Sequence, residues 1–362
     1  MFLKQFHADN FRNLAAFQIE LSRDLNIISG DNAAGKSSLL EAVTYLVSSR
    51  SFRTAKQIPL VAHDSEGFTL FGQFSDSTKV GVSYETLSKI RRIKLDGEVA
   101  RSLSVVASLY PVQVLSPESY HLIDSGPLER RKYIDWLLFH VEHSYQKDWN
   151  DFRRSLKQRN AYLRLNQKRP NIADLDTWNE QYIRSALKID SYRTSISKQI
   201  LPEVQKILAS IGFEYVEDLG MSYYSGHTGC LEDKLAETVK KDFLTGTTQY
   251  GPHKADLRFK IGKYLAKDLL SRGQKKLLVN SLYLAQTQIL KNKTQKDSLF
   301  IVDDFSSELD ESNQTVLVEA LRKQQNVQII LSCLQADMLK SLIKGYNNVK
   351  MFHVEHGEIK EV

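Results

Sequence analysis

The sequence predicts an α/β fold that a helical insertion divides into two lobes. Apolar and alternating runs typical of strands fill the first hundred residues and return from about residue 256. Residues 127–208 are almost continuously compatible with helix and contain few glycines. A glycine-rich loop near residue 30 lies between an apolar run and a helical pattern. We therefore expect a mixed β and α/β core built from both ends of the chain, with a helical lobe inserted between them.

Each element follows from a local pattern. In the first part we expect a helix at Lys36–Val47 and strands at Phe2–Asn10, Phe17–Leu21, Leu25–Ser29, Phe68–Phe74, Lys79–Tyr84, Ile90–Leu95 and Pro111–Leu115. Turn residues at 75–78 and at Asp96-Gly97 predict hairpins. Pro170 and Pro202 are expected to punctuate the helical stretch. The last part predicts strands Asp256–Ile261, Ser298–Val302, Val327–Ser332 and Val349–Val354, with helices Ser271–Leu290, Glu311–Lys323 and Gln335–Ile343.

The composition is that of an ordinary globular protein. The chain has 362 residues, 42% hydrophobic and 25% charged, which excludes disordered and fibrous classes. Its net charge of +6 permits a nucleic-acid partner without requiring one. Cys230 and Cys333 are far apart, so we expect reduced thiols. With no signal-peptide pattern and no long apolar window, a soluble cytoplasmic protein without membrane association is expected.

The loop from Gly30 fits the pattern G-x-x-x-x-G-K-[ST] at every position. Glycines let such a loop curl so that its backbone N–H groups face phosphate oxygens at a helix N-terminus. Lys36 would neutralise the β- and γ-phosphates, and the Ser37 hydroxyl could ligate Mg²⁺. A chance glycine-rich turn is the alternative. The predicted nucleotide contacts are Gly30, Asp31, Asn32, Ala33, Ala34, Gly35, Lys36, Ser37 and Ser38.

Two further segments complete a nucleotide site. The apolar run Ser298–Val302 ends in Asp303 and Asp304, which is typical of a Walker B strand. Asp303 would help Ser37 to hold Mg²⁺, and Asp304 would act as general base toward water; an acidic turn that caps the next helix is the alternative. Ser271-Arg272-Gly273-Gln274 opens a helix with a good N-cap, which offers free N–H groups to a phosphate.

In this order the three motifs resemble an ATP-binding-cassette head. The segments NFRN at 10–13, SFRT at 51–54, SPES at 116–119, GPHKADL at 251–257, LSRGQKK at 270–276 and VDDFSSELD at 302–310 resemble the RecF family. The match runs through nearly the whole chain. The resemblance implies an ABC-type P-loop ATPase head, with mixed β plus a Walker-type α/β core and an inserted helical lobe. We expect the discontinuous ATPase lobe at 1–125 plus 246–362 and the helical lobe II at 126–245.

The resemblance also implies a mechanism and partners. ATP with Mg²⁺ would close a homodimer in which Lys36 of one copy faces Ser271, Arg272, Gly273 and Gln274 of the other, and slow hydrolysis, stimulated by DNA, would reopen it. Gln113 would be a catalytic and metal-sensing glutamine that links the lobes, Arg12 would approach the phosphates, and Asp310 would lie at the dimer seam. Such a protein would act in the nucleoid at single-strand gaps and stalled forks, with RecO and RecR, to promote RecA loading.

Two departures from the cassette pattern stand out. The second Walker B acid is Asp304 where many cassette ATPases carry Glu, which suits slow turnover. The switch histidine is missing after the strand at 327–331, where Ser332 and Cys333 stand. Rival interpretations are a transporter nucleotide-binding subunit, which should carry that histidine, and a chromosome-organising head, which should carry long arms.

A basic run marks the candidate DNA contact. Residues 153–169 include seven basic side chains and no acid. On a helix, Arg153, Lys157, Arg164 and Lys168 would fall within one stripe of about 60°, with apolar residues on another face. Such a stripe suits phosphate contacts to double-stranded, gapped or junction DNA without sequence specificity. A merely solvated helix face is the alternative. A weaker candidate for the DNA contact consists of Lys89, Arg91, Arg92 and Lys94 with Arg50 and Arg53.

Overall fold

The computed structural model describes residues 1–100, 103–305, 311–324, 326–335, 339 and 343–362. These residues form two compact units, unit 1 with residues 1–120 and 276–362 and unit 2 with residues 121–275. Unit 1 draws on both ends of the sequence, as the motif order predicts. Residues 246–275, which the sequence analysis assigned to the ATPase lobe, lie in unit 2. The reason is that strand β10 (Asp256–Ile261) pairs with β9 (Leu219–Tyr224) of the insertion.

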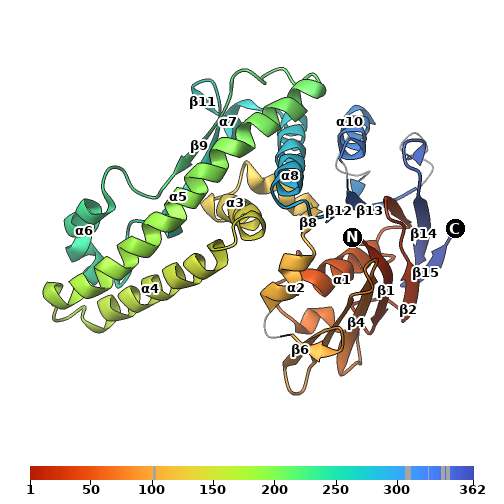
Figure 1. Ribbon diagram of the computed structural model, residues 1–362, viewed down its shortest axis with the longest axis horizontal. Helices are drawn as coiled ribbons and strands as arrows, with labels where there is room; N and C mark the ends of the chain where they lie inside the picture. The colour runs from red at the N-terminus through yellow and green to blue at the C-terminus, as the bar shows by residue number, and fades with distance from the viewer. Residues whose placement is uncertain (101–102, 306–310, 325, 336–338, 340–342) are drawn as a thin grey trace. The chain divides into compact units, whose positions relative to one another are not determined.

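Unit 1 contains two six-stranded sheets (Figure 1). The first is antiparallel, in the order β2-β1-β4-β5-β6-β7. Its strands are β1 (Leu3–Asp9), β2 (Phe17–Glu20), β4 (Gly67–Phe74), β5 (Lys79–Glu85), β6 (Ile90–Leu95) and β7 (Glu98–Val99). The alternating burial of β4 and β5 reflects one face against the core. The predicted hairpin at residues 75–78 is confirmed.

The second sheet has the order β15-β14-β3-β13-β12-β8, parallel except for β15. Its strands are β3 (Leu25–Ser29), β8 (Val112–Leu115), β12 (Ser298–Val302), β13 (Val327–Cys333), β14 (Val349–Glu355) and β15 (Glu358–Glu361). Parallel strands present their carboxyl ends at one edge, where ligands of open α/β sheets bind. The residues that follow β3, β12 and β13 therefore meet at that edge.

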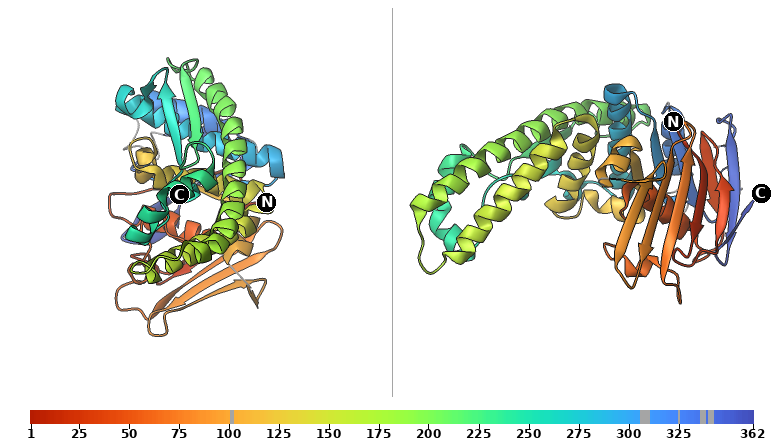
Figure 2. Two further views of the ribbon diagram at one scale, coloured as in Figure 1. Left: turned by 90° about the vertical axis from the view of Figure 1, so that its left-hand side faces the viewer. Right: turned by 60° about the horizontal axis from the view of Figure 1, so that its bottom comes forward.

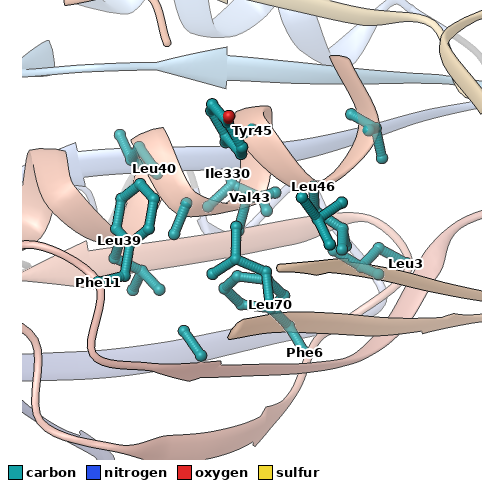
Figure 3. Packing of buried hydrophobic residues seen from close by; sticks show 14 of the residues in the cluster. Leu3, Phe6, Phe11, Leu39, Leu40, Val43, Tyr45, Leu46, Leu70 and Ile330 are labelled. Carbon is teal, nitrogen blue, oxygen red and sulfur yellow. The ribbon is translucent and has the colours of Figure 1, made fainter. Parts of the chain in front are cut away.

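Helix α1 (Lys36–Ser48) packs in the core between the two sheets. Its Leu39, Leu40, Val43 and Leu46 join Phe6 and Leu70 of the antiparallel sheet and Ile330 of the parallel sheet (Figure 3). Phe11 and Phe68 meet edge to face with ring centroids 5.1 Å apart. The helix that begins at the glycine-rich loop is thus fixed by apolar burial along nearly its whole length. Among the described residues, the other α-helices of unit 1 are α2 (Leu103–Leu109), α10 (Glu311–Arg322) and most of α8 (Arg272–Thr294).

Unit 2 is mainly helical, with the three-stranded sheet β11-β10-β9. Its elements, besides β9 and β10, are α3 (Pro127–Val141), α4 (Tyr145–Leu165), α5 (Ile172–Ser210), α6 (Leu231–Thr245), β11 (Tyr264–Leu265) and α7 (Ala266–Leu269). Helices α4 and α5 pack along each other, and α5 curves along its length (Figure 2). Pro202 lies inside α5, which corrects the expectation that it would punctuate the helical stretch. Among the described residues no helix has the length and apolar character needed to cross a membrane.

Buried ion pairs hold unit 2 together. Arg159 of α4 is fully buried and its Nη2 lies 2.8 Å from the carboxylate of Asp242 in α6. Arg193 of α5 is also fully buried, and its Nε donates to Asp135 at 2.8 Å. His253 lies among these groups, and burial lowers its pKa to about 4. Its Nε2 lies 2.9 Å from the carbonyl oxygen of Thr248, so this residue has a structural role in unit 2.

Candidate nucleotide site

The glycine-rich loop joins the fully buried strand β3 to helix α1. Its backbone enters the left-handed region at Gly30 (φ 148°), Ala33 (φ 64°) and Gly35 (φ 123°). A Cβ at Gly30 would lie 2.3 Å from the carbonyl oxygen of Val354, so this position admits only glycine. Asp31, Asn32 and Ala33 are exposed. The curled and accessible loop is the geometry that cradles a phosphate chain.

Two neighbouring segments hold this loop. The Ser38 hydroxyl donates to Asn13 Oδ1 at 2.7 Å, and Asn13 Nδ2 donates to the carbonyl oxygen of Ala33 at 3.4 Å. On the other side, the Gly357 N–H donates to the carbonyl oxygen of Ala34 at 2.9 Å. Ser38 is buried, and its hydroxyl therefore fixes the loop where the sequence predicted a nucleotide contact. Asn13 is a site residue that sequence reasoning did not assign, although it lies in the segment NFRN.

Lys36 folds back over its own loop. Its Nζ donates to the carbonyl oxygens of Gly30 at 2.7 Å and Asp31 at 2.8 Å. The side chain is only 8% exposed. Among the bonds described, this buried ammonium is held by neutral carbonyl oxygens, and such a group strongly attracts an anion, because charge-assisted bonds to phosphate are roughly twice as strong as neutral ones. Lys36 is therefore poised to donate hydrogen bonds to phosphate oxygens.

The parallel sheet brings Ser37 and Asp303 together from positions 266 residues apart. The Ser37 hydroxyl donates to Asp303 Oδ1 at 2.9 Å. Burial raises the pKa of Asp303, and hydrogen bonds from Ser332 and Ser37 oppose that rise. The predicted pairing of these two residues is thus present at the carboxyl edge of the sheet.

Asp304 follows directly and has an unusual backbone. Its φ of 57° lies in the left-handed region, which aspartate tolerates better than most residues. Its N–H donates to the Ser332 hydroxyl at 2.8 Å. The side chain is half-buried, whereas that of Asp303 is buried. The two acids thus differ in environment, which suits a division into a metal ligand and a group that faces water.

The oxygen donors of this site fit Mg²⁺. Mg²⁺ usually takes one or two carboxylates together with substrate phosphates and waters. The Ser37 hydroxyl and the desolvated Asp303 carboxylate offer such a partial set. Within the described ranges, no cluster of three or more His, Cys, Asp or Glu side chains forms a metal cage. The Ser37 hydroxyl and the Asp303 carboxylate leave room for nucleotide phosphates and water as further Mg²⁺ ligands.

Comparisons with known proteins agree with this geometry. The family described as "RecF/RecN/SMC N terminal domain" matches residues 2–360. The "DNA replication and repair protein RecF" of Hahella chejuensis is 34% identical, with both chains fully covered. That of Pseudoalteromonas atlantica is 36% identical, with 97% of each chain covered. This chain belongs to the RecF family.

Solved structures of the RecF family superpose closely. The one described as "Structure of the recombination mediator protein RecF-ATP in RecFOR pathway" gives a TM-score of 0.87 at 27% identity, covering 100% of this chain and 97% of that one. An SMC head bound to a ScpA domain gives 0.58 at 14% identity, covering 100% and 97%, which shows a common fold. The predicted family and the ABC-type ATPase head fold are therefore confirmed.

The RecF resemblance gave Gln113 a metal-sensing role, which its surroundings do not favour. Gln113 lies in the interior of β8, opposite Phe300, and is 3% exposed. Its Nε2 donates to Gln286 at 2.6 Å, and its Oε1 accepts a hydrogen bond from Thr287 at 2.7 Å. Both polar atoms of the side chain are thus bonded to α8. In the register of the sheet, Gln113 lies beside Phe300, three residues before Asp303. Gln113 therefore ties the edge strand of the sheet to α8 in this structure, and its metal-sensing role stays a prediction.

Arg12, expected near the phosphates in a RecF protein, is held by a buried acid. Its Nε and Nη2 both donate to the Glu41 carboxylate at 2.9 Å. Glu41 is fully buried in α1, one turn after Ser37, and it also accepts the Ser51 hydroxyl. Arg53 lies 3.7 Å from Glu41, and its charge weakly opposes the rise that burial causes in the pKa of Asp303. The sequence suggests Arg53 only as part of the weaker DNA-contact candidate, and it suggests no role for Glu41.

The signature segment of the RecF family begins α8 with a reciprocal cap. The Gln274 N–H donates to the Ser271 hydroxyl at 3.3 Å, and the Ser271 N–H donates to Gln274 Oε1 at 3.0 Å. Ser271 and Arg272 are exposed, and Gly273 is half-buried. The predicted N-cap is confirmed, and it places the segment on an accessible surface of unit 2. Asp310 lies outside the described residues.

The basic stripe is only partly helical. Arg153, Lys157 and Arg164 are exposed on α4, but the helix ends at Leu165, so Lys168 lies in the loop that follows. The prediction that Lys168 belongs to the helical stripe is therefore wrong. Arg159, from the same basic run, is buried because Asp242 pairs with it. Three exposed cations remain on one face of α4.

Proposed function

We propose that this chain is an ATP-dependent DNA-binding recombination mediator. ATP binding closes a homodimer on DNA, and slow, DNA-stimulated hydrolysis reopens it. The dimer acts at single-strand gaps and stalled forks with RecO and RecR to promote RecA loading. Support comes from membership of the RecF family and from relatives described as ATP-bound in the RecFOR pathway.

The observation that carries the ATPase assignment is the contact between Ser37 and Asp303. It joins the phosphate loop and the acidic strand end at one edge of the parallel sheet. Lys36 would hold the β- and γ-phosphates, and Ser37 with Asp303 would hold Mg²⁺, which neutralises phosphate charge when bound. Asp304 would orient and deprotonate the attacking water. An aspartate is one methylene shorter than the usual glutamate, which supports the proposal of slow turnover.

The proposal is tested by the oligomeric state of the protein. We expect size-exclusion chromatography with multi-angle light scattering to show a monomer without nucleotide or with ADP, and a dimer with ATP. Gapped duplex DNA should stabilise the dimer, and RecR with RecO should be recruited to that complex. A mass that does not depend on ATP would contradict the timer mechanism.

Ser271→Arg tests whether the signature segment acts on the other subunit. The variant chain should bind ATP as the parent does, since its own phosphate loop is intact. It should fail to dimerise and to hydrolyse ATP, because a large cation replaces the cap that would face the partner's γ-phosphate. Isothermal calorimetry and light scattering measure the two properties separately.

Mixing the Ser271→Arg and Lys36→Ala chains tests the same composite site independently. The heterodimer contains one intact composite site, so partial ATPase activity should return. If Ser271→Arg instead lowers the ATP affinity of the monomer as much as Lys36→Ala does, the segment acts within its own chain and the dimer proposal falls.

The α4 stripe tests the DNA contact. Alanine substitution of Arg153, Lys157 or Arg164 should in each case make the negative slope of log K against log salt shallower by about 0.9 on duplex DNA. Arg154→Ala is the matched control, because Arg154 lies on the same helix, is 68% exposed and is paired with Asp151. Fluorescence anisotropy over a salt series measures the slopes. Equal slopes for the stripe variants and the control would show that DNA does not contact this face of α4.

A further inference from the structure

We propose that Ser332 positions both acidic residues of the nucleotide site, in the region where cassette ATPases carry a switch histidine. Ser332 lies in β13, the strand between β3, which leads into the phosphate loop, and β12, which leads into the acids. The register pairs Val302 with Leu331, so Ser332 is level with Asp303. It also pairs with Ile28 on the other side.

The Ser332 hydroxyl uses both of its hydrogen-bonding roles on neighbouring residues. It donates to Asp303 Oδ1 at 2.9 Å and accepts from the Asp304 N–H at 2.8 Å. Its side chain is fully buried, so water does not compete for these bonds. One group thus orients the carboxylate of the first acid and holds the left-handed backbone of the second. The backbone conformation at residue 304 sets the direction in which the Asp304 side chain points.

The neighbouring residue, Cys333, cannot replace the Ser332 hydroxyl as a hydrogen-bonding group. Burial raises the pKa of its thiol to about 11, so it remains neutral and is a weak hydrogen-bond donor. Ser37 also bonds to Asp303 Oδ1, but in the proposed function its oxygen faces the metal. Of the hydroxyls described at Asp303, Ser332 is therefore the one that keeps its place when Mg²⁺ is bound. This inference rests on the proposed function and adds a positioning residue to it.

The test separates the binding of ATP itself from the gain in ATP affinity that Mg²⁺ provides. ATP affinity is measured by calorimetry in EDTA and in Mg²⁺, beside single-turnover hydrolysis, for the wild type and three variants. Ser332→Ala should bind metal-free ATP as the wild type does. The gain in affinity that Mg²⁺ provides should fall about tenfold, as should the hydrolysis rate, because a hydrogen bond to a charged group is lost. Ser332→Thr keeps the hydroxyl and should restore both.

Thr44→Val is the matched control. Thr44 is buried in α1, and its hydroxyl donates only to the carbonyl oxygen of Leu40, one turn earlier, among the bonds described. This variant should leave both the Mg²⁺ gain and the rate unchanged. A Ser332→Ala protein with the full Mg²⁺ gain and rate, or a Ser332→Thr protein as impaired as Ser332→Ala, overturns the role of Ser332. A wild-type protein that does not bind Mg·ATP overturns the proposed function itself, and the inference with it.

Discussion

Lys36→Ala is expected to lower ATP affinity by at least about a hundredfold, since it removes two or more charge-assisted bonds, each worth roughly 1.5–3 kcal/mol. Lys36 is the only cation in the phosphate loop, and its buried Nζ contacts only loop carbonyls among the bonds described. ATP-dependent dimerisation should be lost with the nucleotide. Calorimetry measures the affinity, and light scattering measures the mass.

The control for this substitution is Lys4→Ala, which removes an exposed lysine from β1 of the antiparallel sheet. It should bind ATP and dimerise as the parent chain does. An unchanged ATP affinity in Lys36→Ala would show that the nucleotide binds elsewhere, and the assignment of the loop would be lost.

Asp304→Asn should leave ATP binding intact while slowing hydrolysis by about 10²–10⁴-fold, the usual contribution of a general base. The amide keeps the shape of the side chain and tolerates the left-handed backbone at φ 57°. Dimers formed with ATP should therefore persist. Single-turnover hydrolysis and the dissociation rate of the ATP-bound dimer report the two effects.

Asp64→Asn is a control matched in backbone geometry. Asp64 also has a left-handed φ, of 61°, and its side chain is 88% exposed in a loop of unit 1. It should hydrolyse ATP at the wild-type rate. If dimers of Asp304→Asn dissociate as fast as those of the parent chain, another group deprotonates the water.

Most of the nucleotide-site backbone could be predicted from the sequence because its signals are local. A buried strand, two glycines with positive φ and a helix occupy consecutive positions around residue 30. An apolar run ending in Asp303 is equally local. These patterns also place both residues at one edge, since parallel strands align their carboxyl ends.

The sequence does not predict side-chain contacts between residues that lie far apart in the chain. Both polar atoms of the Gln113 side chain form hydrogen bonds with Gln286 and Thr287, which lie more than 170 positions away in the sequence. Arg159 belongs to a basic run, but Asp242 of another helix buries it. The boundary between the units lies at residue 275 and not at the predicted residue 245, because β10 pairs with β9. No local pattern carries these partnerships, since each depends on the tertiary fold.

The contacts that hold the phosphate loop also have a consequence for folding during synthesis. Unit 2 is one continuous segment and can fold once residue 275 has left the ribosome. The loop, in contrast, needs a hydrogen bond from Gly357, and the Ser29 hydroxyl beside it donates to the carbonyl oxygen of Phe352, 323 positions away. We therefore expect a nascent chain to expose its nucleotide motif early and to organise it only after residues 349–357, which contact β3 and the loop, have been made.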